Sequence, residues 1–86
     1  MQLNSRFMKH FTCTIEGQVF SVSVVKEDLE GGICFSGSYV TREGEMKFAY
    51  LLAAGNARVF VPSRLPQNIL NALMDEIDDQ MMWIDN

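Results

Sequence analysis

Apolar and polar residues alternate along most of the first 62 residues of this chain, and glycine-containing breaks interrupt the alternation. Side chains of a β-strand point to opposite faces in turn, so a period of two is typical of strands with one buried face. We expect five strands, near residues 7–15, 18–26, 33–42, 45–54 and 57–62. The breaks at 16–17, 43–44 and 55–56 resemble two-residue hairpin turns, whereas the break from Lys26 to Gly32 is longer and predicts a flexible loop.

The short turns make the predicted sheet testable, because a two-residue turn fixes which residues lie opposite each other. The turn at 43–44 places Gly37 opposite Tyr50, which fits an aromatic ring covering a strand glycine. The turn at 55–56 places Leu52 opposite Val59. Apolar residues meet apolar residues nearly throughout, so a single buried face is predicted.

After residue 62 the pattern becomes helical. Ser63 is expected to cap a helix and Pro66 suits its first turn. Apolar residues then recur at spacings of four and three: Ile69, Leu73, Ile77, Met81 and Ile84. The sequence therefore predicts one amphipathic helix near 65–83. Since 86 residues give room for one core, we expect a single α+β domain over 1–86, an antiparallel meander of about five strands packed on this C-terminal helix.

Composition narrows the class of protein. With 48% hydrophobic and 21% charged residues the chain lies in the globular range. It shows neither the apolar run of a signal peptide nor one of roughly 20 residues that would span a membrane, so we expect a cytoplasmic protein without membrane contact. Cys13 and Cys34 form no disulfide framework and no metal-ligand pair. We predict no cofactor and no metal site.

Charge is distributed unevenly along the chain. Residues 65–86 carry five acids and no base, although the net charge of the chain is only −4. Asp75, Asp78 and Asp79 crowd the end of the predicted helix, where the helix dipole favours cations. Acids at this end of a helix are unfavourable for folding, and the sequence shows no basic residue nearby to offset them, so they suggest a function. A solvated stripe is the commoner explanation, and the alternative is a docking face for a basic protein.

The predicted helix is longer than the sheet is wide, so its end is expected to overhang the sheet. Met81, Met82, Trp83 and Ile84 lie on that overhang. Methionine and tryptophan are enriched at the centres of protein interfaces, so we include Met82 and Trp83 in the candidate partner-binding site. The alternative is that Trp83 folds back to close the core.

The face of the sheet turned away from the helix forms the second candidate site. By parity it carries serine, alanine and few charges, with Arg58 and Phe60 at one edge and Leu51 opposite Phe60. Solvated sheet faces usually carry more lysine, glutamate and threonine. This flat Ser/Ala-rich face could therefore contact a protein partner or a second copy of the chain. The alternative is that it is solvated.

Catalytic patterns are weak in this chain. His10 lies opposite Ser23 in the predicted register, but the sequence supplies neither a third group to hold the imidazole nor an oxyanion site. Gly31 and Gly32 lack the lysine and the following helix of a phosphate loop. We therefore predict no catalytic residues and no enzymatic activity.

Three functions remain open. The leading hypothesis is a non-enzymatic interaction protein that binds a protein partner, basic or not, through the acidic helix, the Ser/Ala-rich face or both. An acidic nucleic-acid mimic that inhibits a basic-groove protein is the alternative. A small-ligand or enzymatic domain with a pocket between helix and sheet is the third. Direct nucleic-acid binding is not expected, because too few basic residues gather on one face.

Overall fold

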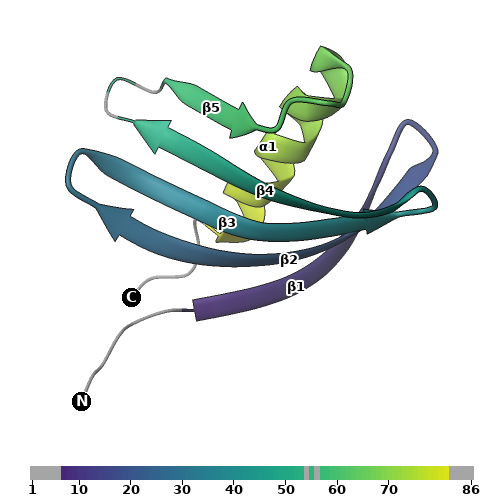
Figure 1. Ribbon diagram of the computed structural model, residues 1–86, viewed down its shortest axis with the longest axis horizontal. Helices are drawn as coiled ribbons and strands as arrows, with labels where there is room; N and C mark the ends of the chain where they lie inside the picture. Colours follow the sequence, from purple (N-terminus) through teal and green to yellow (C-terminus); the bar gives the residue numbers. More distant parts are fainter. Residues whose placement is uncertain (1–6, 54, 56, 82–86) are drawn as a thin grey trace.

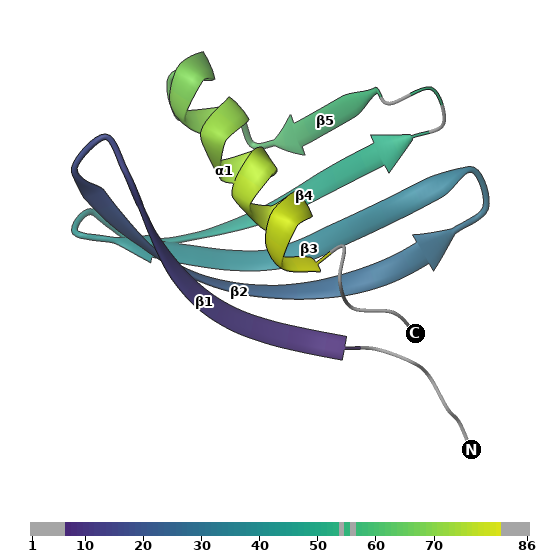
Figure 2. The same cartoon turned by 180° about the vertical axis from the view of Figure 1, so that it is seen from behind.

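A computed structural model of the protein describes residues 7–53, 55 and 57–81. These residues form β1 (Phe7–Ile15), β2 (Gln18–Leu29), β3 (Gly32–Thr41), β4 (Gly44–Ala53), β5 (Arg58–Val61) and α1 (Gln67–Met81). The strands make one antiparallel sheet in the order β1-β2-β3-β4-β5, and α1 lies across one face of it (Figure 1, Figure 2). The predicted α+β meander with a C-terminal helix is confirmed.

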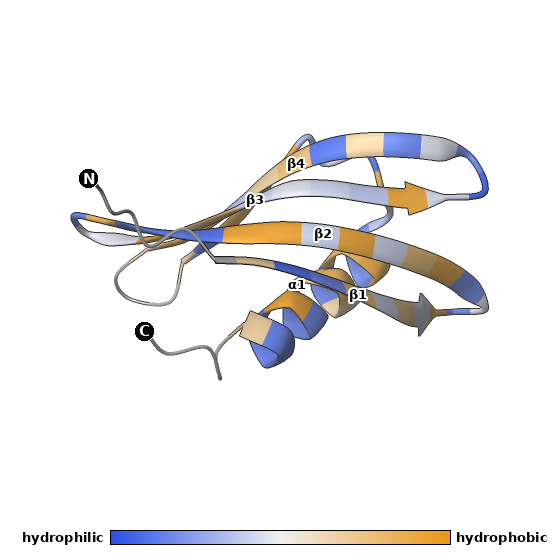
Figure 3. Cartoon of the chain, turned by 90° about the horizontal axis from the view of Figure 1, so that it is seen from below, coloured by the Kyte–Doolittle hydropathy of each residue, from blue (hydrophilic) through white to orange (hydrophobic). Residues whose placement is uncertain are grey.

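The core lies between α1 and the face of the sheet that arches over it (Figure 3). The strands contribute alternate residues to this core, as a half-buried sheet requires. The helix contributes residues three and four apart, which share one of its faces. The buried side chains are Ile15, Phe20, Val22, Val24, Phe35, Tyr39, Phe48, Tyr50, Phe60, Leu70, Leu73, Met74, Ile77 and Met81. We call this side of the sheet the helix face and the other side the open face.

The predicted register between β3 and β4 is wrong by two residues. The turn consists of Arg42 and Glu43, so Gly37 lies opposite Phe48 and not opposite Tyr50. A shift of two keeps every side chain on its predicted face. On the other side, Gly37 pairs with Val24 of β2, and a Cβ atom at Gly37 would clash with the Ser23 carbonyl oxygen. Glycine is therefore required here by close strand packing, not by a covering ring.

The predicted register between β4 and β5 is wrong by one residue, and this changes the face. Residues 54–57 connect the strands, and the Ala53 amide donates to the Ala57 carbonyl oxygen at 2.9 Å. Tyr50 consequently pairs with Phe60. A slip of one residue exchanges the two faces of a strand. Phe60 is therefore in the core, at 6% exposure, and Val59 is 49% exposed on the open face.

The expected flexible loop between Lys26 and Gly32 is instead a hairpin. Strand β2 continues to Leu29, which pairs with Gly32. Only Glu30 and Gly31 form the turn, and Gly31 has a φ of +90°. That backbone conformation costs glycine little, so the turn can be this tight.

The helix begins later than predicted and its end lies closer to the core. The Pro66 carbonyl oxygen accepts from the amides of Ile69 and Leu70, so Pro66, rather than Ser63, precedes the first helical turn. Met81 is fully buried, which contradicts its predicted place on an overhang. Met82, Trp83 and Ile84 lie outside the described residues. No helix in the described part of the chain is long and apolar enough to cross a membrane.

Candidate functional site

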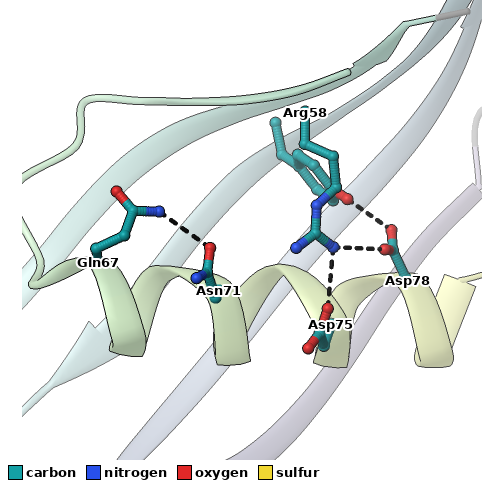
Figure 4. Close-up of polar contacts among 6 residues, drawn as sticks. Arg58, Gln67, Asn71, Asp75 and Asp78 are labelled. Carbon is teal, nitrogen blue, oxygen red and sulfur yellow. Dashed lines mark hydrogen bonds and ion pairs between the residues drawn. The ribbon is translucent and has the colours of Figure 1, made fainter. Parts of the chain in front are cut away.

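The acidic side of α1 faces an arginine from the sheet. Arg58, on β5, directs its guanidinium between Asp75 and Asp78, which are one helical turn apart (Figure 4). The Nη1 atom lies 2.9 Å from Oδ1 of Asp75 and 3.2 Å from Oδ2 of Asp78. Residues three apart share a helix face, so one guanidinium reaches both carboxylates.

Tyr50 completes this network from the core side. Its ring is fully buried, and its hydroxyl donates to Oδ1 of Asp78 at 2.8 Å. Burial raises the pKa of Tyr50 far above its ordinary value, and the hydrogen bond to Asp78 raises it further. The hydrogen bond to Asp75 raises the pKa of Arg58. A buried hydroxyl needs such a partner, because burial without one costs roughly 1 to 3 kcal/mol.

These contacts change the interpretation of the acidic helix. The helix carries no base in its last turn, but Arg58 supplies a positive charge to its carboxylates from β5. The charge pattern that the sequence leaves unexplained is therefore partly structural. The signal was present in the sequence as two acids three apart on a helix and a lone arginine in the preceding strand. The one-residue error in β5 concealed it, because it put Arg58 on the open face.

Asp79 differs from Asp75 and Asp78. It is exposed, and the hydrogen bonds and ion pairs of the described residues do not include it. Asp75 is 70% exposed even though it pairs with Arg58. Of the three aspartates in the predicted docking face, Asp75 and Asp78 share Arg58, and Asp79 has no partner among the described residues.

In the described part of the chain, the large hydrophobic side chains that are exposed lie on the open face. Seven large hydrophobic side chains are exposed among the described residues, and by strand parity all seven point to the open face. They are Met8, Val19, Leu29, Val40, Leu51, Val59 and Val61. Single exposed hydrophobic residues are ordinary on a protein surface, whereas a contiguous exposed apolar patch is typical of an interaction surface.

Register gathers most of these residues at one end of the open face. One row across the sheet is Glu27, Cys34, Leu51 and Val59. The next row is Met8, Val25, Ser36, Ala49 and Val61. We define the apolar patch as Leu29, Cys34, Ala49, Leu51, Val59 and Val61. The rows beyond it consist mainly of hydroxyl-bearing and charged residues, with Val40 and Val19 among them, so the open face has an apolar end and a hydroxyl-rich end.

Two hollows lie at opposite ends of the sheet. One, of about 230 Å³, borders the apolar patch and is lined in part by Leu29, Leu51 and Val59. The other, of about 450 Å³, lies between the turns at Glu16–Gly17 and Arg42–Glu43. Neither lies between helix and sheet, where the sequence analysis places a pocket for a small ligand.

His10 and Ser23 pair on the open face as predicted. The Ser23 hydroxyl and His10 Nδ1 are 2.7 Å apart, and both side chains are accessible to water. Their row continues with Ser38 and Lys47, so the residues beside the pair offer no carboxylate to hold the imidazole. The pair lines neither hollow. This geometry is that of a cross-strand hydrogen bond.

The two thiols are unpaired and lie on opposite faces. Burial raises the pKa of Cys13, and Glu76 raises it further. Burial also raises the pKa of Cys34, with a contribution from Glu27 across the strand pair. Both therefore stay protonated at neutral pH, which makes them poor nucleophiles. In the described residues, no three His, Cys, Asp or Glu side chains come close enough to hold a metal ion.

The structure thus separates the residues of the predicted partner-binding site. Asp75, Asp78 and Asp79 lie on α1, Leu51 lies in the apolar patch, and Phe60 is in the core. The predicted pairing of Leu51 with Phe60 is wrong, since Leu51 lies opposite Val59. Val59 and Val61 are the surface residues that the sequence analysis misplaced. A comparison of this chain with protein-family models, curated protein sequences and solved structures finds no match.

Proposed function

We propose that this protein is a non-enzymatic interaction module that binds another protein subunit through the apolar patch on its open face. The observation that supports this most strongly is that the seven exposed large hydrophobic side chains of the described residues all lie on one face. The helix face is filled, whereas the open face keeps its valines and leucines in water.

Energetics favour a partner on this face. Complete burial of a valine, leucine or methionine contributes roughly 1.5 to 3 kcal/mol. Leu51, Val59 and Val61 are between 36% and 49% exposed, so covering these three alone would contribute on the order of 2 to 4 kcal/mol. A protein surface fits the shallow relief of the patch better than a small molecule, which prefers a deep cavity.

The acidic helix is the weaker alternative for protein binding or nucleic-acid mimicry. Asp78 is engaged by Tyr50 and Arg58, and Asp75 shares the same arginine. A mimic of phosphates needs carboxylates that are free to meet basic side chains. The internal ion pairs therefore count against this function.

The cytoplasm is the compartment that we propose for this binding. Cys13 and Cys34 are both free and partly buried. Free thiols persist in the cytosol, whereas oxidising compartments favour disulfides.

Site-specific photo-cross-linking tests the proposal. We would place p-benzoylphenylalanine at Leu51 and at Val61, in the patch, and at Asp79, on the outside of α1, in cells that make the protein. Discrete adducts from the two patch positions, identified by mass spectrometry as one protein, are expected. Thr12, exposed at the hydroxyl-rich end of the same face, is the matched control. Adducts from Asp79 alone would move the binding site to the helix and contradict the proposal.

A further inference from the structure

We infer that the subunit bound by the apolar patch is a second copy of this chain, packed open face to open face about a twofold axis. This inference rests on the proposed function and adds the identity of the partner. Two properties of the open face support it: its area and the placement of its charges.

The area suits a small symmetric dimer. Four strands of nine or more residues at a spacing of about 4.8 Å, with about 3.4 Å per residue, give a flat footprint on the order of 600 Å². A standard stable interface buries about 800 Å² on each partner. Because the sheet arches over α1 (Figure 3), its open face is convex and contact falls short of the full footprint. The expected dimer is therefore reversible and dependent on concentration.

Opposite charges lie symmetrically about the middle of the open face. Ser36 pairs with Val25 on β2 and with Ala49 on β4. From Ser36, Glu27 lies one strand and one row away in one diagonal direction. Lys47 lies one strand and one row away in the opposite direction. The ion pairs within the described residues involve neither of them.

This placement is self-complementary. Consider two copies that face each other, with a twofold axis between the two sheets and parallel to them. If this axis passes over Ser36 and is perpendicular to the line from Glu27 to Lys47, it exchanges the positions of these two residues. Each Glu27 then meets the other copy's lysine, and the pair forms twice, as an isologous interface requires. With rows about 6.8 Å apart and strands about 4.8 Å apart, the same axis passes over Val59. Val59 therefore meets its own copy, and Leu51 falls near the other copy's Val61.

A charge exchange tests this symmetry. Light scattering coupled to size exclusion, and sedimentation, would give the dimer dissociation constant of the wild-type chain and of each variant. Glu27→Lys and Lys47→Glu each place like charges together twice, so each single change is expected to raise the dissociation constant at least about tenfold. The double variant E27K/K47E restores opposite charges and is expected to return to within about threefold of wild type. Glu43→Lys, in the β3–β4 turn, is the control for charge alone.

The self-contact of Val59 gives a second, independent test. In a chain with Cys13→Ser and Cys34→Ser, Val59→Cys should be joined to its own copy by a short bis-maleimide. Val19→Cys, which is equally exposed at the far end of the same face, should not. Failure of Val59→Cys to cross-link would overturn the twofold arrangement even if the protein is dimeric.

The outcomes also separate this inference from the proposed function. A wild-type monomer at all concentrations, with Leu51 still cross-linked to a different protein, would reject the second copy and leave the interaction module standing. A dimer that survives Leu51→Asp and ignores the charge exchange would reject the second copy on this face, and the absence of adducts from Leu51 and Val61 as well would reject both. Both are supported if Leu51→Asp abolishes dimerisation, each single charge variant weakens it, and E27K/K47E restores it.

Discussion

The two faces of the sheet both carry hydrophobic residues, but these residues are covered on one face and exposed on the other. On the helix face, Phe20, Phe48 and Tyr50 belong to the same core as the apolar side of α1, and each is at most 5% exposed. On the open face, Leu51 and Val59 keep a third to a half of their surface in water. Hydrophobic residues on both sides of an antiparallel sheet are typical of a sheet that is covered on both faces, and only the helix face is covered within the described residues.

The largest expected difference between the faces is in stability. Phe60→Ala empties part of the core beside Tyr50 and should lower the free energy of unfolding by about 3 to 5 kcal/mol. Val59→Thr, one residue away on the open face, should change it by less than about 0.5 kcal/mol. Urea unfolding followed by circular dichroism measures both. Equal effects would mean that the register of β5 is not the one described.

A smaller difference is expected between neighbouring residues of β3. Gly37→Ala forces a methyl group against the Ser23 carbonyl oxygen and should cost about 1 to 3 kcal/mol of stability through strand displacement. Ser38→Ala, which changes only the open face, should be nearly neutral. Thermal unfolding of both variants compares them. A neutral Gly37→Ala would show that β2 and β3 lie further apart than the structure has them.

Loss of the Tyr50 hydroxyl should cost about 1 kcal/mol at neutral pH, because Asp78 keeps its bonds to Arg58. Above about pH 10 the unfolded tyrosine releases its proton, whereas the folded one keeps it, since its pKa is raised. Stability therefore falls as the pH rises beyond that point. Tyr50→Phe should reduce this loss of stability at high pH. Part of the loss should remain, because burial also raises the pKa of Tyr39. Urea unfolding at pH 7 and at about pH 11 tests the sign, and an unchanged slope would contradict it.

The smallest expected effects distinguish the helix carboxylates from one another. Asp78→Asn weakens the contacts with Arg58 and Tyr50 and should cost up to about 1 kcal/mol. Asp79→Asn removes an exposed charge at the unfavourable end of the helix dipole, and it should be neutral or stabilising by a few tenths, about 0.3 kcal/mol. Chemical unfolding at low and high salt compares them. A larger loss in Asp79→Asn would show a contact that the structure does not contain.

The alternation of apolar and polar residues was enough to predict the meander and, in four strands, which residues lie on the helix face. A register error of an even number of residues leaves every side chain on its predicted face. The shift of two residues at the Arg42–Glu43 turn changed which residues of β3 and β4 lie opposite each other, but it did not change the face on which each side chain lies. In β5 the shift was odd, and β5 has only four residues, which are apolar on both sides apart from Arg58. So short an edge strand specifies its register weakly.

The candidate site was harder to predict because it depends on that one residue. With Arg58 assigned to the open face, the helix acids have no partner in the sequence and look functional. With Arg58 on the helix face, Asp75 and Asp78 have a structural role, and Val59 and Val61 extend the apolar patch. The partner of an ion pair distant in sequence cannot be read from local pattern, since only the register brings the two together.

The order of the elements also bears on how the protein is made. Each strand pairs with the next one along the chain, so the meander can form hairpin by hairpin during synthesis, with little loop entropy to overcome. The helix follows all five strands. Until it leaves the ribosome, Phe20, Phe48 and their neighbours have no cover, and the nascent sheet exposes apolar surface on both sides. Docking of α1, held by Arg58 and Tyr50, then covers one of the two faces and leaves the other exposed, which is the face on which we propose the dimer.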